Sequence, residues 1–250
     1  MIGLAGRVAL VTGGNRGIGR ATALLLARAG ADVGITYHRR AADAERTVAA
    51  IQAVGCRSVA LNGDLADAGT VERIFDAAVK ELGPLDLFVG NAGIWPPEEV
   101  ALRDLDELRW RATMAADLDA VFLTTRAALR RMRPGGRIVL VGSTAGQRGE
   151  AYHADYAATK GAMISLVKSL AVECAPDITV NCVAPGWVDT EMAAGALSGD
   201  AGARIAATIP LRRVAAAEDV AGPIVFLCSD LARHITGEIL NVNGGSVLCG

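Results

Sequence analysis

Short runs of β-branched and aliphatic residues alternate, along most of the chain, with longer runs in which apolar residues recur at helical spacing. The short runs predict strands and the longer runs predict amphipathic helices. This alternation is typical of a parallel sheet with helices on both faces. We expect strands at residues 7–12, 32–37, 58–61, 85–89, 136–142, 178–183 and 238–242, and helices at residues 18–29, 41–54, 68–82, 104–133, 154–175 and 218–229.

One interval, residues 189–214, breaks this alternation, because Gly195, Gly199, Gly202 and Pro210 interrupt its weak helical patterns. Such a segment is expected to form a mobile flap over a binding site. The sequence contains no internal repeat and no low-complexity linker. We therefore expect residues 1–250 to form a single α/β domain with one flap.

The composition fits this fold and excludes some classes of protein. A chain of 250 residues is long enough for one large domain with a buried core. Its 52% hydrophobic content, with many alanines and glycines, suits helices packed closely on a buried parallel sheet. A net charge of −2 argues against nucleic-acid binding, because there is no basic surplus to displace counterions.

The cysteines and histidines indicate neither disulfides nor a metal site. The five cysteines, the last of which is Cys249, form no Cys-x-x-Cys pair and are odd in number, which predicts free thiols in a reducing compartment. The three histidines are far apart and form no metal-ligand pattern, so no metal is expected. We find no secretory signal and no apolar segment long enough to span a membrane, and therefore expect a cytoplasmic protein with no membrane partner.

The first predicted strand leads directly into a glycine-rich segment, Thr12-Gly13-Gly14-Asn15-Arg16-Gly17-Ile18-Gly19. Glycine permits a tight turn, close approach of the backbone to a pyrophosphate, and close packing of a helix on a strand. The amide groups at the start of the following helix then bind the anion. The alternative is a tight turn without a ligand. We expect a dinucleotide phosphate to be bound by Gly13, Asn15, Arg16, Gly17, Ile18 and Gly19.

The second predicted strand is followed by His38, Arg39 and Arg40, with no acidic residue. Many dinucleotide-binding folds place an acid here, which binds the ribose hydroxyls of the adenosine. A carboxylate would repel a 2′-phosphate, whereas guanidinium groups bind it with charge-assisted hydrogen bonds. These residues, together with Arg16, therefore favour NADP(H) over NAD(H). The alternative is that the two arginines only begin a solvated helix.

Polar and small residues also follow the third and fourth predicted strands. Asp64 and Leu65 follow one strand, and Asn91, Ala92 and Gly93 follow the other. An open α/β sheet binds its ligand at the carboxyl ends of the strands. Asp64 is a candidate acceptor for an adenine amino group, and the small residues would let a cofactor lie against the backbone. Asp and Asn are also ordinary turn residues, so each has a structural alternative.

Ser143, Tyr156 and Lys160 are the candidate catalytic residues. Tyr156 and Lys160 are four residues apart in a predicted helix, which places them on one face about one turn apart. A phenol alone ionises near pH ~10, and a nearby cation favours the phenolate, so the pair would serve as a proton donor and acceptor near neutrality. From these two residues alone, a tyrosine and a lysine on a solvated helix is the simpler interpretation.

Five short motifs follow one another along the chain: Thr12-Gly13-x-x-x-Gly17-x-Gly19, Asn91-Ala92-Gly93, Ser143, Tyr156-x-x-x-Lys160 and Pro185-Gly186. In this order they resemble the short-chain dehydrogenase/reductase family, in its compact branch, over essentially the whole chain. The resemblance implies a Rossmann-type doubly wound sheet of seven mainly parallel strands, a nicotinamide cofactor and a Ser–Tyr–Lys site. Tyr156 would then protonate the carbonyl oxygen of the substrate, Ser143 would stabilise that oxygen, and Lys160 would lower the pKa of the phenol and hold the nicotinamide ribose.

The same resemblance implies a nicotinamide-facing segment and an assembly. Pro185, Gly186, Val188 and Thr190 would pack on the nicotinamide. Relatives commonly form tetramers through their long helices, and the alanine-rich faces of residues 104–133 and 154–175 permit close helix contact, so a homotetramer is expected. An apolar face buried within one subunit would give the same pattern.

One residue departs from the family pattern. Relatives usually carry an asparagine that anchors a water leading protons from the lysine to solvent, and this chain has Asp117 there. A carboxylate would pair with Lys160 and partly cancel its effect on Tyr156. We expect either an active enzyme with a shifted pH optimum or a weakened enzyme.

The nearest subgroup is the NADPH-dependent 3-oxoacyl-acyl-carrier-protein reductases of fatty acid biosynthesis, which need basic residues to meet an acidic carrier protein. The helix that carries Tyr156 ends without an arginine, although Arg130, Arg131 and Arg133 lie on the preceding predicted helix. The alternatives are a reductase of another small ketone, sugar or secondary metabolite, and a non-catalytic NADP(H)-sensing protein. A partly hydrophobic pocket is indicated by four apolar residues of the flap, Met192, Ile205, Ile209 and Leu211.

Overall fold

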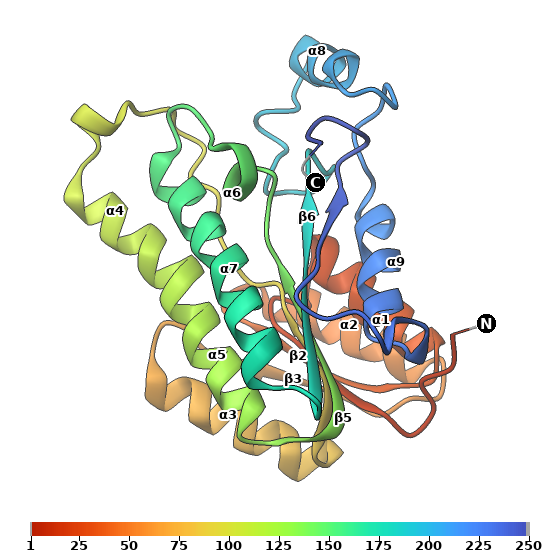
Figure 1. Ribbon diagram of the computed structural model, residues 1–250. Coiled ribbons are helices and arrows are strands. Elements are labelled where there is room, and N and C mark those ends of the chain that lie inside the picture. The colour runs from red at the N-terminus through yellow and green to blue at the C-terminus, as the bar shows by residue number, and fades with distance from the viewer. Residues whose placement is uncertain (1, 249–250) are drawn as a thin grey trace.

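Seven parallel strands form one sheet in the computed structural model, which describes residues 2–248 (Figure 1). The strand order is β3-β2-β1-β4-β5-β6-β7, so the order reverses between β1 and β4. This is the predicted Rossmann-type sheet, and ligands bind such sheets outside the carboxyl ends of the strands, at the reversal. The strands are β1 (Val8–Val11), β2 (Asp32–Tyr37), β3 (Ser58–Asn62), β4 (Leu85–Gly90), β5 (Met132–Val141), β6 (Ile178–Pro185) and β7 (Ile239–Val242).

Helices cover both faces of this sheet (Figure 1). One face is covered by α1, α2 and α9, and the other is covered by α3, α5 and α7. The helices are α1 (Gly17–Arg28), α2 (Ala41–Gln52), α3 (Ala68–Leu82), α4 (Glu107–Thr113), α5 (Ala120–Leu129), α6 (Ala145–Arg148), α7 (Ala154–Glu173), α8 (Asp200–Thr208) and α9 (Ala217–Leu227).

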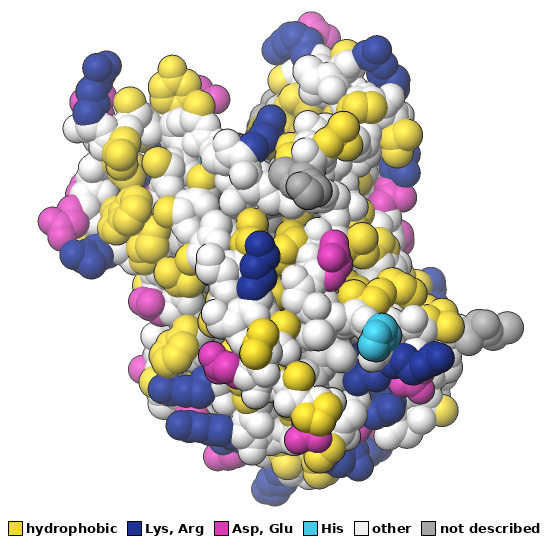
Figure 2. Space-filling view, in the orientation of Figure 1, with side chains coloured by type: hydrophobic (Ala, Val, Ile, Leu, Met, Phe, Trp, Pro, Cys, Tyr) yellow, Lys and Arg dark blue, Asp and Glu magenta, His cyan; other side chains and the backbone are white. Residues whose placement is uncertain are grey.

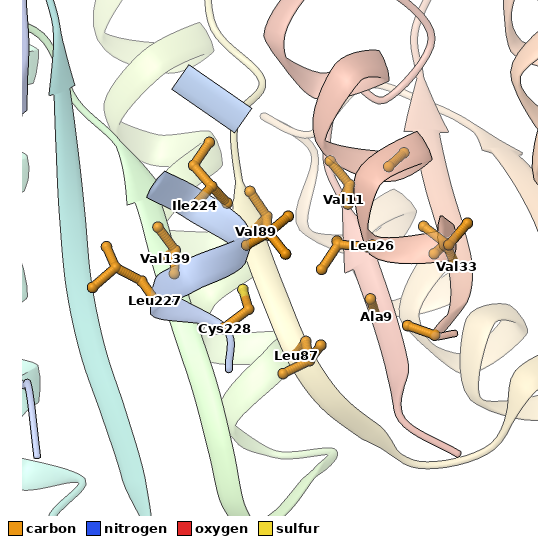
Figure 3. Close-up of a cluster of buried hydrophobic side chains, with 14 of the residues drawn as sticks. Ala9, Val11, Leu26, Val33, Leu87, Val89, Val139, Ile224, Leu227 and Cys228 are labelled. Atoms are coloured by element: carbon orange, nitrogen blue, oxygen red, sulfur yellow. The ribbon is translucent and has the colours of Figure 1, made fainter. Parts of the chain in front are cut away.

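The strand β1 shows how one short segment serves both cores. Ala9 and Val11 belong to the apolar cluster beneath α1 and α9, whereas Val8 and Leu10 belong to the cluster beneath α3 and α5. Figure 3 shows the first cluster, in which Ile224 of α9 lies over the strands. Successive strand residues point to opposite faces, so a strand buried on both sides is apolar throughout. This is why continuous apolar runs predicted the strands correctly.

The single helix predicted at residues 104–133 is wrong, because the structure divides this stretch into several elements. A 3-10 turn (Leu102–Asp104) precedes α4, a π-helical segment (Met114–Asp119) separates α4 from α5, and α5 ends before β5 begins. The side chain of Asp106 starts α4 by accepting a hydrogen bond from the backbone amide of Leu108 at 2.9 Å. The π-helical segment reads Met-Ala-Ala-Asp-Leu-Asp and contains no glycine or proline that would mark an interruption, so the sequence pattern did not reveal it.

The predicted flap, residues 189–214, leaves the sheet after β6 and contains the helix α8, which the sequence pattern did not resolve. Its two ends are held together by backbone hydrogen bonds. The amide of Asp189 donates to the carbonyl of Ala215 at 2.8 Å, and the amide of Ala215 donates to the carbonyl of Trp187 at 3.1 Å. The flap is therefore closed at its base, and it is also attached after β7, because the Leu211 amide donates to the Gly244 carbonyl oxygen at 3.2 Å.

Two further predictions concern cysteines and membranes. Cys56, Cys174, Cys182 and Cys228 carry free thiols, as expected, and Cys249 lies outside the described residues. No helix within residues 2–248 combines the length and the apolar character that a membrane crossing needs.

Candidate functional site

A cavity of about 610 Å³ opens at the carboxyl ends of the strands. In the space-filling view, this edge of the molecule is hollowed between the part that carries α4 and the part that carries α8 (Figure 2). The cavity gathers residues from every segment that sequence reasoning selected. All predicted cofactor residues and Ser143, Tyr156 and Lys160 line it, except Gly19, and Asp117 lies behind its wall.

Close backbone packing explains the glycines of the first loop. Gly13 has a φ of +65°, which favours glycine, and a Cβ at Gly14 would lie 2.5 Å from a methyl group of Ile35 in β2. A Cβ at Gly19 would lie 2.3 Å from the carbonyl oxygen of Gly13, so a side chain there would push α1 away from the loop. Gly19 therefore does not line the cavity but allows α1 to pack closely against the glycine loop. The amide of Gly13 is also held by the Thr36 hydroxyl at 3.2 Å, a contact that no sequence pattern revealed.

Basic side chains line one end of the cavity. Arg16 lies in the glycine loop, and Arg39 and Arg40 lie between β2 and α2. The two segments are joined because the side-chain amide of Asn15 donates to the carbonyl oxygen of Arg39 at 3.3 Å. Arg40 is 3.8 Å from Asp43, whereas Arg16 and Arg39 have no carboxylate partner within the described part of the chain. Two guanidinium groups are thus free to bind an anion, and His38 lines the same end.

The residues after β3 and β4 line the middle of the cavity. Asn91 fixes the glycine loop, because its side-chain amide donates to the carbonyl oxygen of Thr12 at 2.9 Å. The Thr12 hydroxyl accepts in turn from the backbone amides of Asn91 and Ala92. A Cβ at Gly93 would lie 3.0 Å from the carboxylate of Asp117, so only glycine leaves the cavity wall open there.

Ser143, Tyr156 and Lys160 come together at the other end of the cavity. Tyr156 and Lys160 are on one face of α7, with the Lys160 Nζ 5.4 Å from the centre of the phenol ring. Lys160 also donates to the carbonyl oxygen of Val141 at 3.4 Å. Ser143 follows β5. The chain after it packs closely on α7 because Gly146 has no side chain. A Cβ at Gly146 would lie 2.4 Å from the carbonyl carbon of Lys160.

Tyr152, the other tyrosine of this region, does not share the site. Its side chain is 56% exposed and does not line the cavity. Position thus distinguishes Tyr156, which lines the cavity, from Tyr152.

The electrostatics of Tyr156 differ from the sequence expectation. Burial raises the pKa of the phenol, and Lys160 and a hydrogen bond with Ser143 oppose that rise, while the carboxylates of Asp117 and Glu150 add to it. The net direction is upward, whereas the sequence predicted a lowered pKa. Lys160 keeps its charge, because Asp117 and Tyr156 outweigh the opposing effect of burial and raise its pKa. The sequence argument counted only the charges of Lys160 and Asp117 and missed both burial and Glu150.

Asp117 lies in the π-helical segment and is completely buried. One carboxylate oxygen accepts from the backbone amide of Ile94 at 2.7 Å. The other is 3.8 Å from Lys160 Nζ and has no hydrogen-bond partner within residues 2–248. Burial raises the pKa of Asp117, and the lysine opposes this rise. The predicted pairing of Asp117 with Lys160 is therefore present.

A buried ion pair holds the start of α7, and sequence reasoning missed it. The carboxylate of Asp155, next to Tyr156 in the chain, accepts from Arg109 at 3.1 Å and from the Thr113 hydroxyl at 2.9 Å. Arg109 also donates to the carbonyl oxygen of Glu98 at 2.7 Å. These bonds tie α4 to the helix turn that carries Tyr156. The three residues are too far apart in sequence to form a recognisable motif.

Three arginines considered for a carrier protein lie elsewhere. Arg130, Arg131 and Arg133 sit where α5 turns into β5, at the amino-end edge of the sheet and opposite the cavity. Arg130 and Arg131 pair with Glu72 at 3.3 and 2.7 Å, and Arg133 pairs with Asp86 at 3.1 Å. They are therefore engaged and cannot line the mouth of this cavity.

The flap contributes less apolar lining than its composition indicated. Met192 lines the cavity, but Ile209 is buried beneath Gly244 and Leu211 is 66% exposed. The substrate end has instead an aromatic and acidic wall of Trp95, Glu150 and Trp187, which sequence reasoning did not select.

The cavity fits a phosphorylated dinucleotide. One continuous lining is formed by three features: the glycine loop, two unpaired guanidinium groups, and the small residues Ala92 and Gly93. In the glycine loop, a Cβ at Gly14 or Gly19 would clash with neighbouring atoms. These groups match a pyrophosphate, a further phosphate and a flat ring pressed on backbone. The residues present are thus compatible with a nicotinamide cofactor.

Comparison with known proteins points in the same direction. A sequence family described as enoyl-(acyl carrier protein) reductase matches residues 13–246. The 3-oxoacyl-[acyl-carrier-protein] reductase FabG of Escherichia coli (strain K12) is 41% identical over 244 residues, which cover 96% of this chain and 97% of that protein. Cis-4-hydroxycyclohexanecarboxylate dehydrogenase of Sinomonas cyclohexanicum is 42% identical over 242 residues, which cover 96% of each. Among solved structures, a short chain dehydrogenase from Burkholderia cenocepacia J2315 in complex with NADP has a TM-score of 0.90 and 40% identity, with 97% and 98% of the two chains covered.

Proposed function

Because the chain belongs to the short-chain dehydrogenase/reductase family and is an oxidoreductase acting on C=O or CH–OH groups, we propose the following function. The protein reduces a ketone to a secondary alcohol with NADP(H). The observation that carries the proposal is the shared cavity. One end holds the glycine loop and unpaired arginines, and the other holds Tyr156 beside Lys160. A redox cofactor and a proton donor would meet there.

The cofactor is proposed to lie along the cavity and, when bound, supplies the hydride. The glycine loop, residues 13–19, would hold its pyrophosphate. Arg16, Arg39 and Arg40 would hold a 2′-phosphate, which makes NADP(H) the preferred cofactor over NAD(H). The adenine would lie near Asp64 and Leu65. The nicotinamide would face the segment formed by Pro185, Gly186, Val188 and Thr190.

Tyr156 is proposed to donate its phenolic proton to the carbonyl oxygen of the substrate. Ser143 donates a hydrogen bond to the same oxygen and stabilises the charge that develops on it. Lys160 stabilises the phenolate that remains after transfer, because its ammonium lies beside the ring. Asp117 acts on Tyr156 only through Lys160 and the local field, so it is a positioning residue. A raised phenol pKa keeps Tyr156 protonated, as reduction requires.

Two substrate classes remain, and identity to relatives does not choose between them. FabG of Escherichia coli is named for a 3-oxoacyl carrier-protein substrate, and the Sinomonas enzyme, at nearly the same identity, is named for a substituted cyclohexane. The first class is proposed because the match to 3-oxoacyl reductases covers nearly the whole chain. The second is favoured by the arginines, since Arg130, Arg131 and Arg133 lie at the opposite edge and are paired.

The assembly is proposed to be a homotetramer that works in the cytoplasm. Large apolar side chains remain exposed on α4, α5 and α7, on the side of the molecule where Figure 2 shows several hydrophobic patches. These residues are Leu108, Phe122 and Val172, with exposures of 77%, 49% and 80%. Burial between subunits would remove them from water.

The central test compares Tyr156→Phe with Tyr152→Phe, a matched loss of one phenol oxygen four residues earlier. We expect Tyr156→Phe to lower kcat by about a hundredfold or more, as for loss of a general acid, while Tyr152→Phe keeps the parent rate. The assay follows NADPH oxidation with 3-oxoacyl thioesters and simple ketones. Equal activities of the two variants would refute the assignment. Tight NADPH binding without turnover of any substrate would indicate the non-catalytic, NADP(H)-sensing alternative.

A further inference from the structure

The substrate end of the cavity has an aromatic wall built from three separate segments. Trp95 follows β4, His153 precedes α7, and Trp187 follows β6. The indole of Trp95 stacks on the His153 ring, with centroids 4.8 Å apart and planes inclined by 16°. Trp187 meets Trp95 edge to face, with centroids 5.8 Å apart. Trp95 and Trp187 line the cavity, while His153 is buried behind them.

This wall is held in place from behind. The His153 Nδ1 lies 3.3 Å from the carbonyl oxygen of Ala151, which can only accept, so this nitrogen donates and fixes the ring orientation. The amide of Val100 donates to the carbonyl oxygen of Tyr152 at 3.0 Å, which joins the Trp95 loop to the His153 loop. An aromatic surface fixed in this way offers a flat, preformed contact area.

Glu150 places a carboxylate in the same wall. Its side chain is half-buried and lines the cavity together with the indole of Trp95. Burial raises the pKa of Glu150, and its charge in turn raises the pKa of Tyr156, which lines the same cavity. Arg148 also lines the cavity, but it is exposed and forms no ion pair with Glu150 within the described residues.

The chemistry of Glu150 restricts what binds beside it. An ionised carboxylate only accepts hydrogen bonds and has room for several donors. A half-buried acceptor without enough donors is unfavourable, so a ligand that brings a donor gains binding energy. A 3-oxoacyl chain offers only carbonyl acceptors and methylene groups near its reacting ketone. An acidic substituent would meet electrostatic repulsion.

We propose that Trp95, Trp187 and Glu150 form a substrate subsite that selects a ring ketone carrying a hydroxyl donor over a straight 3-oxoacyl chain. The indoles pack against the ring, and Glu150 accepts from the hydroxyl. This inference rests on the proposed ketone reduction and names its substrate class.

The test uses a matched series of ketones with NADPH: cyclohexanone, 4-hydroxycyclohexanone, 4-oxocyclohexanecarboxylate, and the N-acetylcysteamine thioester of acetoacetate. In the parent enzyme, we expect kcat/KM for the hydroxy ketone to exceed that for cyclohexanone by about tenfold or more. The carboxylate and the thioester should be poorer than cyclohexanone. Glu150→Ala should remove the preference for the hydroxyl and relieve the discrimination against the carboxylate. Glu99→Ala, which removes an exposed carboxylate of the Trp95 loop, is the control and should change neither ratio.

Three outcomes would overturn the subsite: equal kcat/KM for cyclohexanone and its hydroxy derivative, a preference for the thioester over the rings, or a hydroxyl preference that survives in Glu150→Ala. Failure of the proposed reduction is a different result, in which none of the four compounds is turned over. In that case, quenching of indole fluorescence by the same ring compounds still tests the subsite, because it measures their binding without turnover. Tighter binding of the hydroxy compound by the parent than by Glu150→Ala supports the subsite, and equal binding refutes it.

Discussion

Replacing Asp117 by asparagine removes one buried charge and leaves the shape of the site intact. The asparagine oxygen can still accept from the Ile94 amide, as the aspartate oxygen does at 2.7 Å. Lys160 Nζ is 3.8 Å from the Asp117 carboxylate and 5.4 Å from the centre of the Tyr156 ring. The carboxylate is therefore no more than about 9 Å from the centre of that ring and about 12 Å from its phenol oxygen, and at an effective dielectric constant of about 20 its repulsion of a phenolate is at least about 1.4 kcal/mol. Loss of the charge should lower the pKa of Tyr156 by about one unit.

The assay is the pH dependence of kcat/KM in both directions. Reduction needs the protonated phenol, so its rate falls as the pH rises through the pKa of Tyr156, and in Asp117→Asn this fall should occur about one unit lower. Oxidation of the alcohol needs the phenolate, so its rise with pH should move down by the same amount. Asp119→Asn, an exposed carboxylate of the same π-helical segment, is the control and should keep the parent profile. Profiles of Asp117→Asn that superimpose on the parent, or that move to higher pH, would refute the reasoning.

Three other perturbations test the framework of the site. Replacing Arg39 and Arg40 by alanine should weaken NADPH binding about tenfold or more and leave NADH binding nearly unchanged; equal effects in titrations with both cofactors would exclude 2′-phosphate recognition. Asp155→Ala should lower the free energy of unfolding by about 2 kcal/mol, because it leaves the partly buried Arg109 and the Thr113 hydroxyl without their acceptor, and denaturant titration that finds less than about 1 kcal/mol would contradict this. Gly146→Ala places a Cβ 2.4 Å from the main chain of α7, so it should lower the free energy of unfolding by about 1–3 kcal/mol and greatly reduce kcat. In Gly195→Ala the Cβ meets nothing within 4 Å, so stability and kcat should stay at the parent values.

Local sequence patterns were sufficient for the sheet and for the position of the glycine loop after β1. Both are determined by neighbouring residues: apolar runs form strands, and glycines such as Gly14 and Gly19 permit contacts that a Cβ would prevent. The pairing of Tyr156 with Lys160 was also accessible, because their spacing matches one helical turn. These predictions needed no knowledge of distant contacts.

The remaining features depend on residues that are far apart in sequence. Trp95, Glu150 and Trp187 meet only because three strand ends converge on one edge of the sheet. The upward pKa of Tyr156 depends on burial, which no local pattern measures. The arginines after α5 seemed available for a carrier protein until strand direction placed them at the opposite edge. The change to π-helix within residues 104–133 was missed because no glycine or proline marks it in the sequence.

The joined ends of the flap have a consequence for how the specificity of such a protein can change. Main-chain bonds between Asp189 and Ala215 and between Trp187 and Ala215 close residues 189–214 at their base, and a bond from the Leu211 amide to the Gly244 carbonyl oxygen at 3.2 Å attaches the returning part to the segment after β7. The part of the flap before Ile209 can therefore vary in length and composition without disturbing the register of β6 and β7. A flap from a relative could be exchanged as one cassette, and the exchange would alter the lining supplied by Met192 while the wall of Trp95 and Glu150 stays in place.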